Sequence, residues 1–190
     1  MNIYISIDEV VESNNPLNYL LELKDRFPDF KATLFAGLFR CSESYLELLE
    51  SKEWLEVCAY GFYGKPREME FYNKPRIEIM FSDMEEQYGA YFIKGFKAPN
   101  FAFTEITYEV CQEKGYWINM HPYHKKPFPT GMQYYKFNKD VDGFEFAGHS
   151  DNNSYDKKGI NQSFNLLVQT LEHIDDKQFK FCSENLKINV

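Results

Sequence analysis

The chain has 190 residues, 44% hydrophobic and 26% charged, so it is long enough for one folded domain and fits neither a disordered chain nor a membrane protein. A net charge of −8 without any long basic run disfavours binding to nucleic-acid phosphates. Aromatic residues make up 18%, more than a minimal core needs, which predicts that some rings line a groove or pocket. We interpret residues 1–190 as a single domain.

Strands and helices alternate along the predicted chain. Ile3, Ile5 and Ile7 predict a first strand over Asn2–Ile7, which ends at the acidic pair Asp8-Glu9. Further strands are predicted at 31–36, 54–58, 91–96, 116–119, 133–137, 143–147 and 178–182. Helices are predicted at 16–26, 43–52, 76–88, 104–115 and 162–173, with Asn15, Ser42 and Thr104 as N-terminal caps. Residues 60–75, 120–131 and 148–159 are expected to be loops.

This alternation is typical of right-handed strand–helix–strand units and a parallel sheet, which places the chain in the α/β class. A full eight-fold barrel usually takes about 250 residues, so the length favours a distorted or reduced (β/α) barrel. In such folds the residues that follow the carboxyl ends of the strands share one rim. Function is expected at that rim.

Two features indicate the protein's surroundings. The first residues lack a charged start with an apolar run, and no stretch approaches about 18 apolar residues, so we expect a cytoplasmic protein without a membrane segment. The four cysteines have no CxxC spacing, and three lie in apolar stretches. We interpret them as buried reduced thiols rather than as disulfides or zinc ligands.

Ionisable side chains recur where the predicted strands end. Asp8 and His149 would provide a base and an acid facing each other across a cleft, which acyl transfer to water requires. A cation at Lys97 would hold Asp8 ionised and oriented. The other reading is structural, because an Asp-Glu pair also suits the start of a helix and His149 also suits a turn.

The remaining histidines have weaker signals. His121 and His124 are three residues apart in a proline-rich loop, a spacing that allows metal ligation but also simple packing or hydrogen bonding. His173 lies near the end of the last predicted helix, where it would face solvent or interact with the helix dipole.

Several sequence blocks resemble the polysaccharide deacetylase family, whose fold is a distorted (β/α) barrel of about this length. The blocks are SIDEV, FPDFKATLFAG, EVCAYGFYG, GFKAPNF, GYWINMHP and FAGHSDNN, and their order and spacing agree with the family over most of the chain. The resemblance implies removal of acetyl groups from amino sugars or other glycans.

The resemblance also implies roles for individual residues. Asp8 keeps the position of the general base, and His149 that of the general acid. Lys97 and Pro99 represent the arginine-proline block that orients the base. Glu9 stands where the family has a metal-binding aspartate.

The family's two metal-binding histidines are missing, because the alignment puts Tyr60 and Gly64 in their places. A zinc-like divalent metal is expected of the family, yet a catalytic zinc needs about three protein ligands and Glu9 alone cannot hold one. Without a metal, several kcal/mol of transition-state stabilisation are lost. A relocated site would draw on Glu9 with His121, His124 or Asp151, so the cofactor is left open.

Three hypotheses follow from these observations. The first is a divergent hydrolase that uses Asp8, His149 and Lys97. The second is an inactive deacetylase-like protein whose aromatic residues Tyr60, Tyr63, Phe101 and Phe103 stack on a carbohydrate or another small ligand. The third is an interaction subunit with the exposed rings at a protein interface. The residues expected to contact a ligand are Tyr60, Tyr63, Pro99, Asn100, Phe101, His121 and Asp151. The oligomeric state is open.

Overall fold

The structure is a computed structural model that describes residues 1–125, 127–149 and 159–190. Within these residues one sheet of nine strands has the order β7-β1-β2-β3-β4-β5-β6-β9. The ninth strand, β8, pairs with the first residues of β1, which precede the part of β1 that pairs with β2. The strands are β1 (Asn2–Val10), β2 (Ala32–Ala36), β3 (Leu55–Tyr60), β4 (Gly95–Lys97), β5 (Trp117–Asn119), β6 (Gln133–Tyr135), β7 (Phe144–His149), β8 (Gln178–Lys180) and β9 (Lys187–Ile188).

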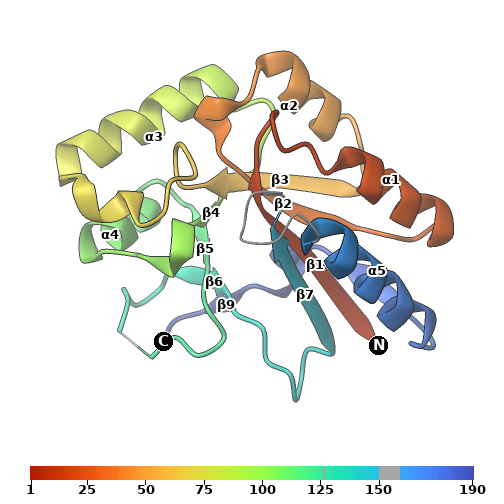
Figure 1. Cartoon of the computed structure of the whole chain (residues 1–190). Helices are drawn as coiled ribbons and strands as arrows, with labels where there is room; N and C mark the ends of the chain where they lie inside the picture. Colours follow the sequence, from red (N-terminus) through yellow and green to blue (C-terminus); the bar gives the residue numbers. More distant parts are fainter. Residues whose placement is uncertain (126, 150–158) are drawn as a thin grey trace.

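The sheet is curled, and helices lie around its outer side (Figure 1). They are α1 (Leu17–Arg26), α2 (Glu43–Glu50), α3 (Lys74–Tyr88), α4 (Glu105–Glu113) and α5 (Gly159–Glu172). All neighbouring strands pair in parallel except β6 and β9. The predicted α/β class and reduced (β/α) barrel are confirmed. Among the described strands the sheet ends at β7 on one side and at β9 on the other, and the barrel is open because these two strands do not pair.

Local sequence explains where the helices begin. The hydroxyl oxygens of Ser42 and Thr104 accept hydrogen bonds from the backbone N–H groups of Tyr45 and Thr107, as the predicted caps require. Asn73 does the same for α3, which starts two residues earlier than predicted. None of the helices in the described ranges is long and apolar enough to cross a membrane.

Alternation along the strands separates two hydrophobic clusters. On β1, Ile3, Ile5 and Ile7 point outward and pack in the large core under the helices. Tyr4 points the other way, into a smaller cluster on the concave side of the sheet. That cluster consists of Tyr4, Phe35, Cys58, Tyr60, Trp117, Tyr135 and Cys182. All four cysteines are buried, which agrees with their interpretation as thiols packed in the core.

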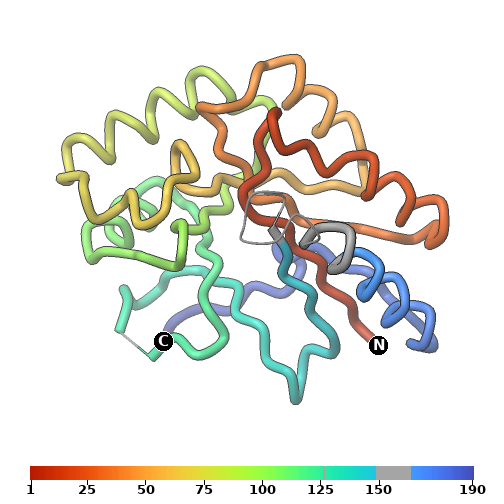
Figure 2. Tube along the Cα trace, in the orientation of Figure 1, coloured from red at the N-terminus to blue at the C-terminus, as the bar shows by residue number. Residues whose placement is uncertain are grey.

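The last described segment closes the end of the barrel where the strands begin. In Figure 2 its blue trace runs from β1 across to β6, and β8 and β9 pair with those two strands. Between them, the backbone N–H of Cys182 donates to Thr33 Oγ1 at 2.9 Å, and Ser183 Oγ donates to the carboxylate of Glu56. The opposite end, where the parallel strands finish, carries the candidate site.

Several boundaries differ from the predictions, and one strand was not predicted. β1 continues to Val10 instead of ending at Ile7, because its pairing with β2 shifts register between Ile7 and Val10 and then resumes. β4 spans only Gly95–Lys97, since the preceding aromatic residues pack on the core as a loop. β9 was not predicted, because two residues carry no readable alternation.

Candidate functional site

A buried ion pair lies at the carboxyl end of the sheet. Lys97, the last residue of β4, places Nζ 2.8 Å from Oδ1 and 2.7 Å from Oδ2 of Asp8 on β1. The Lys97 side chain is 2% exposed and that of Asp8 is 6% exposed. Both oxygens of the carboxylate therefore face one ammonium group, which fixes the orientation of Asp8.

Two rings enclose the ammonium group of Lys97. Its Nζ lies 4.5 Å from the ring centre of Phe101 and 5.1 Å from that of Phe35. Cations over aromatic faces gain electrostatic attraction, more so when little water reaches them. Phe35 comes from the middle of β2, and no sequence pattern distinguished it from an ordinary core residue.

The backbone around the ion pair is held in an unusual conformation. Glu9 has φ +57°, Asn100 +56° and Phe101 +52°, all in the left-handed region. Such residues cost of the order of 1–3 kcal/mol each and persist where the surroundings over-determine them. They directly follow the two strands that carry the Asp8–Lys97 pair, with Glu9 next to Asp8 and with Asn100 and Phe101 in the turn after β4.

The structure brings His149 to the same place by strand register. β7 pairs in parallel with β1 from Ile3 to Asp8, and His149 is the Cα partner of Asp8. Glu145 lies earlier on β7, four residues before His149. Burial raises the pKa of its carboxyl group, while the charge of Lys97 opposes the shift. Asp151 lies outside the described residues.

Tyr60 is the last residue of β3, and the sequence resemblance aligns it with a metal-binding histidine of the family. Its side chain is 1% exposed and belongs to the concave-side cluster. Burial raises the pKa of its hydroxyl, and the negative charge of Asp8 adds to the shift. A phenol held neutral in this way is a poor metal ligand, and the ring offers almost no surface for stacking on a ligand.

The loop after β3 is organised by a carboxylate from within the chain. Glu68, 2% exposed, accepts hydrogen bonds from the backbone N–H groups of Phe62 at 2.8 Å, Tyr63 at 3.2 Å and Gly64 at 3.2 Å. Its pKa is raised by burial, against these three hydrogen bonds. Glu68 sits in a loop rich in glycine and proline, where an isolated acidic residue gives no sequence signal of this role.

The described residues do not fit a catalytic divalent metal. No group of three or more His, Cys, Asp or Glu side chains in the described part of the chain is placed to hold one. Tyr60 and Gly64, which the sequence resemblance aligns with the family's two histidines, provide no ligand, and the Asp8 carboxylate is engaged by Lys97. No chemical step is therefore derived through a metal.

The remaining predicted residues surround this centre at different depths. Pro99 is buried, and Asn100 is exposed beside it. Tyr63 is half-buried against Phe39, with ring centres 5.4 Å apart, and Phe103 stacks on Tyr108 at 5.0 Å. Phe103 is therefore engaged in the core.

The loop histidines have protein partners. The exposed His121 accepts a hydrogen bond at Nδ1 from the backbone N–H of Tyr123 at 3.1 Å, and its ring lies 5.1 Å from that of Phe101. His124 Nε2 lies 3.4 Å from the hydroxyl of Tyr108. At the end of α5, His173 Nδ1 lies 2.6 Å from the carbonyl oxygen of Gln169.

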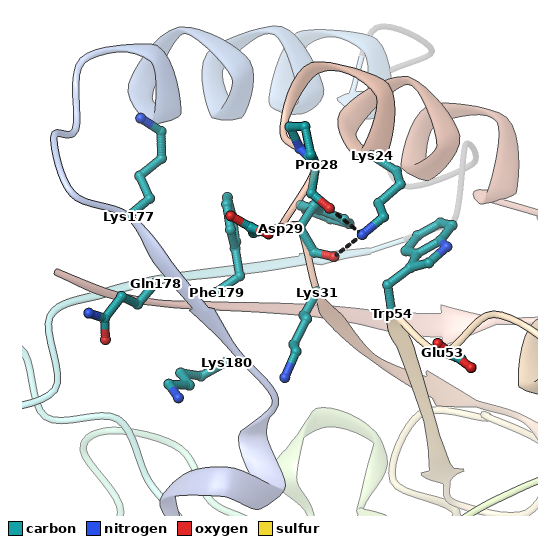
Figure 3. A pocket seen from close by; sticks show the side chains of 11 residues that line it. Lys24, Pro28, Asp29, Lys31, Glu53, Trp54, Lys177, Gln178, Phe179 and Lys180 are labelled. Atoms are coloured by element: carbon teal, nitrogen blue, oxygen red, sulfur yellow. Dashed lines mark hydrogen bonds between the residues drawn. The ribbon is translucent and has the colours of Figure 1, made fainter.

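A separate pocket of about 560 Å³ opens at the other end of the barrel, beside the first residues of β2, β3 and β8 (Figure 3). Lys24, Lys31, Lys177 and Lys180 line it. Lys24 Nζ donates to the carbonyl oxygens of Pro28 and Phe30, and Lys31 and Lys180 both pair with Glu184. These cations point in different directions in Figure 3, so the pocket has no convergent polar centre.

Comparison with solved structures identifies the architecture. A family 4 acetyl xylan esterase from Clostridium thermocellum, solved with a cobalt ion, superposes with a TM-score of 0.64 at 13% identity, covering 97% of this chain and 89% of that one. A protein from Mycobacterium smegmatis described as a polysaccharide deacetylase gives 0.67 at 13% identity, over 96% and 87% of the two chains. The chain has the polysaccharide deacetylase fold.

A third structure with this fold is a CE4 family pseudoenzyme from Bacillus anthracis, with a TM-score of 0.59 at 14% identity over 94% of this chain and 68% of that one. No protein-family model and no curated protein matches the sequence. The fold resemblance predicted from the sequence blocks is confirmed. The deacetylase fold includes both esterases and a pseudoenzyme, so activity must be argued from the site.

Proposed function

We propose that the protein is a divergent hydrolase that removes acetyl groups from a glycan, with Asp8, Lys97 and His149 as its reacting and orienting groups. The observation that carries this proposal is the buried Asp8–Lys97 ion pair, with His149 in register beside Asp8. Taking two charges out of water is costly, so a buried pair is weak evidence of a stabilising role and better evidence of a retained site.

The proposed reaction uses these three groups. Water attacks the acetyl carbonyl carbon, and Asp8 accepts the proton that the water loses as the new C–O bond forms. The bond from the carbonyl carbon to the sugar nitrogen or oxygen then breaks, and His149 donates the proton that the leaving atom needs. Acetate and a free amine or hydroxyl are the products. Lys97 keeps the Asp8 carboxyl group oriented throughout.

The test measures acetate release from acetylated chito-oligosaccharides and from a simple acetyl ester, with and without added zinc or cobalt. The wild-type chain should turn over at least one of them, and Asp8→Asn should abolish turnover because it removes the base. Asp25→Asn, an exposed carboxylate on α1 and away from the site, is the matched control and should keep full activity. Equal rates for wild type and Asp8→Asn would refute the proposal.

A second candidate, glycan binding without catalysis, is favoured by the burial of Tyr60 at a family ligand position. In that case the rim contacts a sugar but no acetyl group is cleaved. Thermal-shift screening against glycans separates the two candidates, because a stabilising ligand without acetate release supports binding alone.

A further inference from the structure

An aromatic groove beside the candidate site has no role in the reaction above. It has a volume of about 770 Å³, within the range of about 300–1,000 Å³ that ligand pockets span. It lies between the loop that follows β5 and the loop that follows β6. Its main lining side chains are Pro122, Tyr123, Tyr134, Phe137, Lys136 and Lys139.

The rings of this groove are held in place from behind. Tyr134 packs edge-on against Phe128 with ring centres 5.1 Å apart, and Phe137 packs against Tyr4 at 6.4 Å. Tyr123 is different, because it is 81% exposed. A large ring left in water beside two fixed rings is suited to stack on the apolar face of a sugar.

A row of ring contacts joins the groove to the Asp8–Lys97 pair. Lys97 Nζ lies 4.5 Å from the Phe101 ring centre, Phe101 lies 5.1 Å from His121, and His121 lies 5.6 Å from Tyr123. The Tyr123 ring is therefore at most about 15 Å from the Lys97 ammonium. One extended ligand can lie in the groove and reach the ion pair.

The charge of the groove is opposite to that of the chain as a whole, which carries −8. Three ammonium groups line it, from Lys136, Lys139 and Lys187, against the single lining carboxylate of Asp140. Lys187 pairs with Asp142 at 3.2 Å, and Lys136 donates to the carbonyl oxygen of His124 at 2.9 Å. Lys139 is exposed and has no ion pair with any described residue, so it is free to meet a ligand charge.

We propose that this groove binds the carboxylate-bearing sugar units of an acidic glycan. Tyr123, Tyr134 and Phe137 stack on the sugar rings, and Lys139 with Lys136 pairs with their carboxylates. The proposal rests on the proposed function, because it names the chemical class of the chain whose acetyl group is presented to Asp8. It concerns binding, which can be measured without turnover.

The experiment titrates trigalacturonate and its methyl ester into the whole protein by calorimetry. The two probes have the same rings and differ only at the carboxyl groups, which are charged in the acid and neutral and methylated in the ester. Trigalacturonate should bind several-fold more tightly than the ester. Added salt should weaken the binding of trigalacturonate and leave the binding of the ester unchanged. Equal affinity for the two probes, or no binding of either, would overturn the proposal.

Two variants locate the site. Lys139→Gln should lower the affinity for trigalacturonate by about two- to fivefold and leave the affinity for the ester unchanged. Tyr123→Ala should lower the affinity for both probes by about two- to tenfold. Lys52→Gln, at the end of α2, is the matched control and should bind as wild type does. If neither groove variant changes binding, the groove is not the site.

Acetate release and the titration, both measured on the wild-type protein, separate this proposal from the proposed function. Charge-selective binding with no acetate release from any substrate leaves the groove standing and removes the hydrolase. Acetate release without charge selectivity keeps the hydrolase and removes the acidic glycan.

Discussion

Replacing Lys97 by methionine would leave the Asp8 carboxylate buried without its partner. The Asp8 side chain is 6% exposed, and Lys97 provides the only ion pair that a described residue makes with it. Breaking a buried pair by removing one partner costs about 3–5 kcal/mol. Methionine fills most of the lysine volume and packs well against Phe35 and Phe101, so the loss of contacts adds little.

The double variant isolates the charge term. In Asp8→Asn/Lys97→Met neither charge remains, so the free energy of unfolding should recover by about 2–3 kcal/mol relative to Lys97→Met alone. Urea unfolding followed by circular dichroism measures all four proteins of the cycle. Two results would refute the assignment of Asp8 and Lys97 as a buried charged pair. One is a loss of unfolding free energy below about 1 kcal/mol for Lys97→Met, and the other is a loss in the double variant that equals the sum of the losses in the two single variants.

Two further predictions concern buried carboxylates. Gly61 has φ +56°, and a Cβ there would lie 1.7 Å from Glu68 Oε1. Gly61→Ala should therefore lower the melting temperature more than the control Gly115→Ala, because Gly115 also has a positive φ of +75° but open space around it. Equal losses in the two variants would show that the Glu68 side chain moves aside at no cost. Burial raises the pKa of Glu56, so its contribution to stability is present below the unfolded pKa of about 4.3 and is lost as the pH rises through the folded value. Glu56→Gln should therefore gain stability relative to wild type between about pH 4 and pH 8, measured by urea unfolding, and a difference that does not change with pH would contradict this.

The sequence predicted the fold well because its strands and helices have strong periodic patterns. The Ile3, Ile5 and Ile7 alternation located β1, and the Ser42 and Thr104 caps located two helices. It also brought Asp8 and Lys97 to one rim, since parallel strands end together. The boundaries that failed depend on tertiary packing.

The site was harder to predict where it depends on residues without a local pattern. Tyr60 was expected to contact a ligand, but its position at the inner face of β3 buries it with Trp117 and Tyr135. Glu68 and Phe35 act through contacts with elements distant in the sequence. The groove around Tyr123 and Lys139 joins two loops, and only the folded chain shows that their side chains converge.

The loop after β3 is poorly suited to the histidine pair that the sequence resemblance would place at Tyr60 and Gly64. Gly64 has φ +69°, so a histidine there would adopt a left-handed backbone at a cost of about 1–2 kcal/mol. A histidine at Tyr60 would also remove a ring from a packed cluster and leave a void. Two point mutations would introduce two histidine side chains but not the backbone geometry and packing that a metal site needs. Introducing a histidine pair into this loop by single substitutions would therefore pass through variants of lower stability.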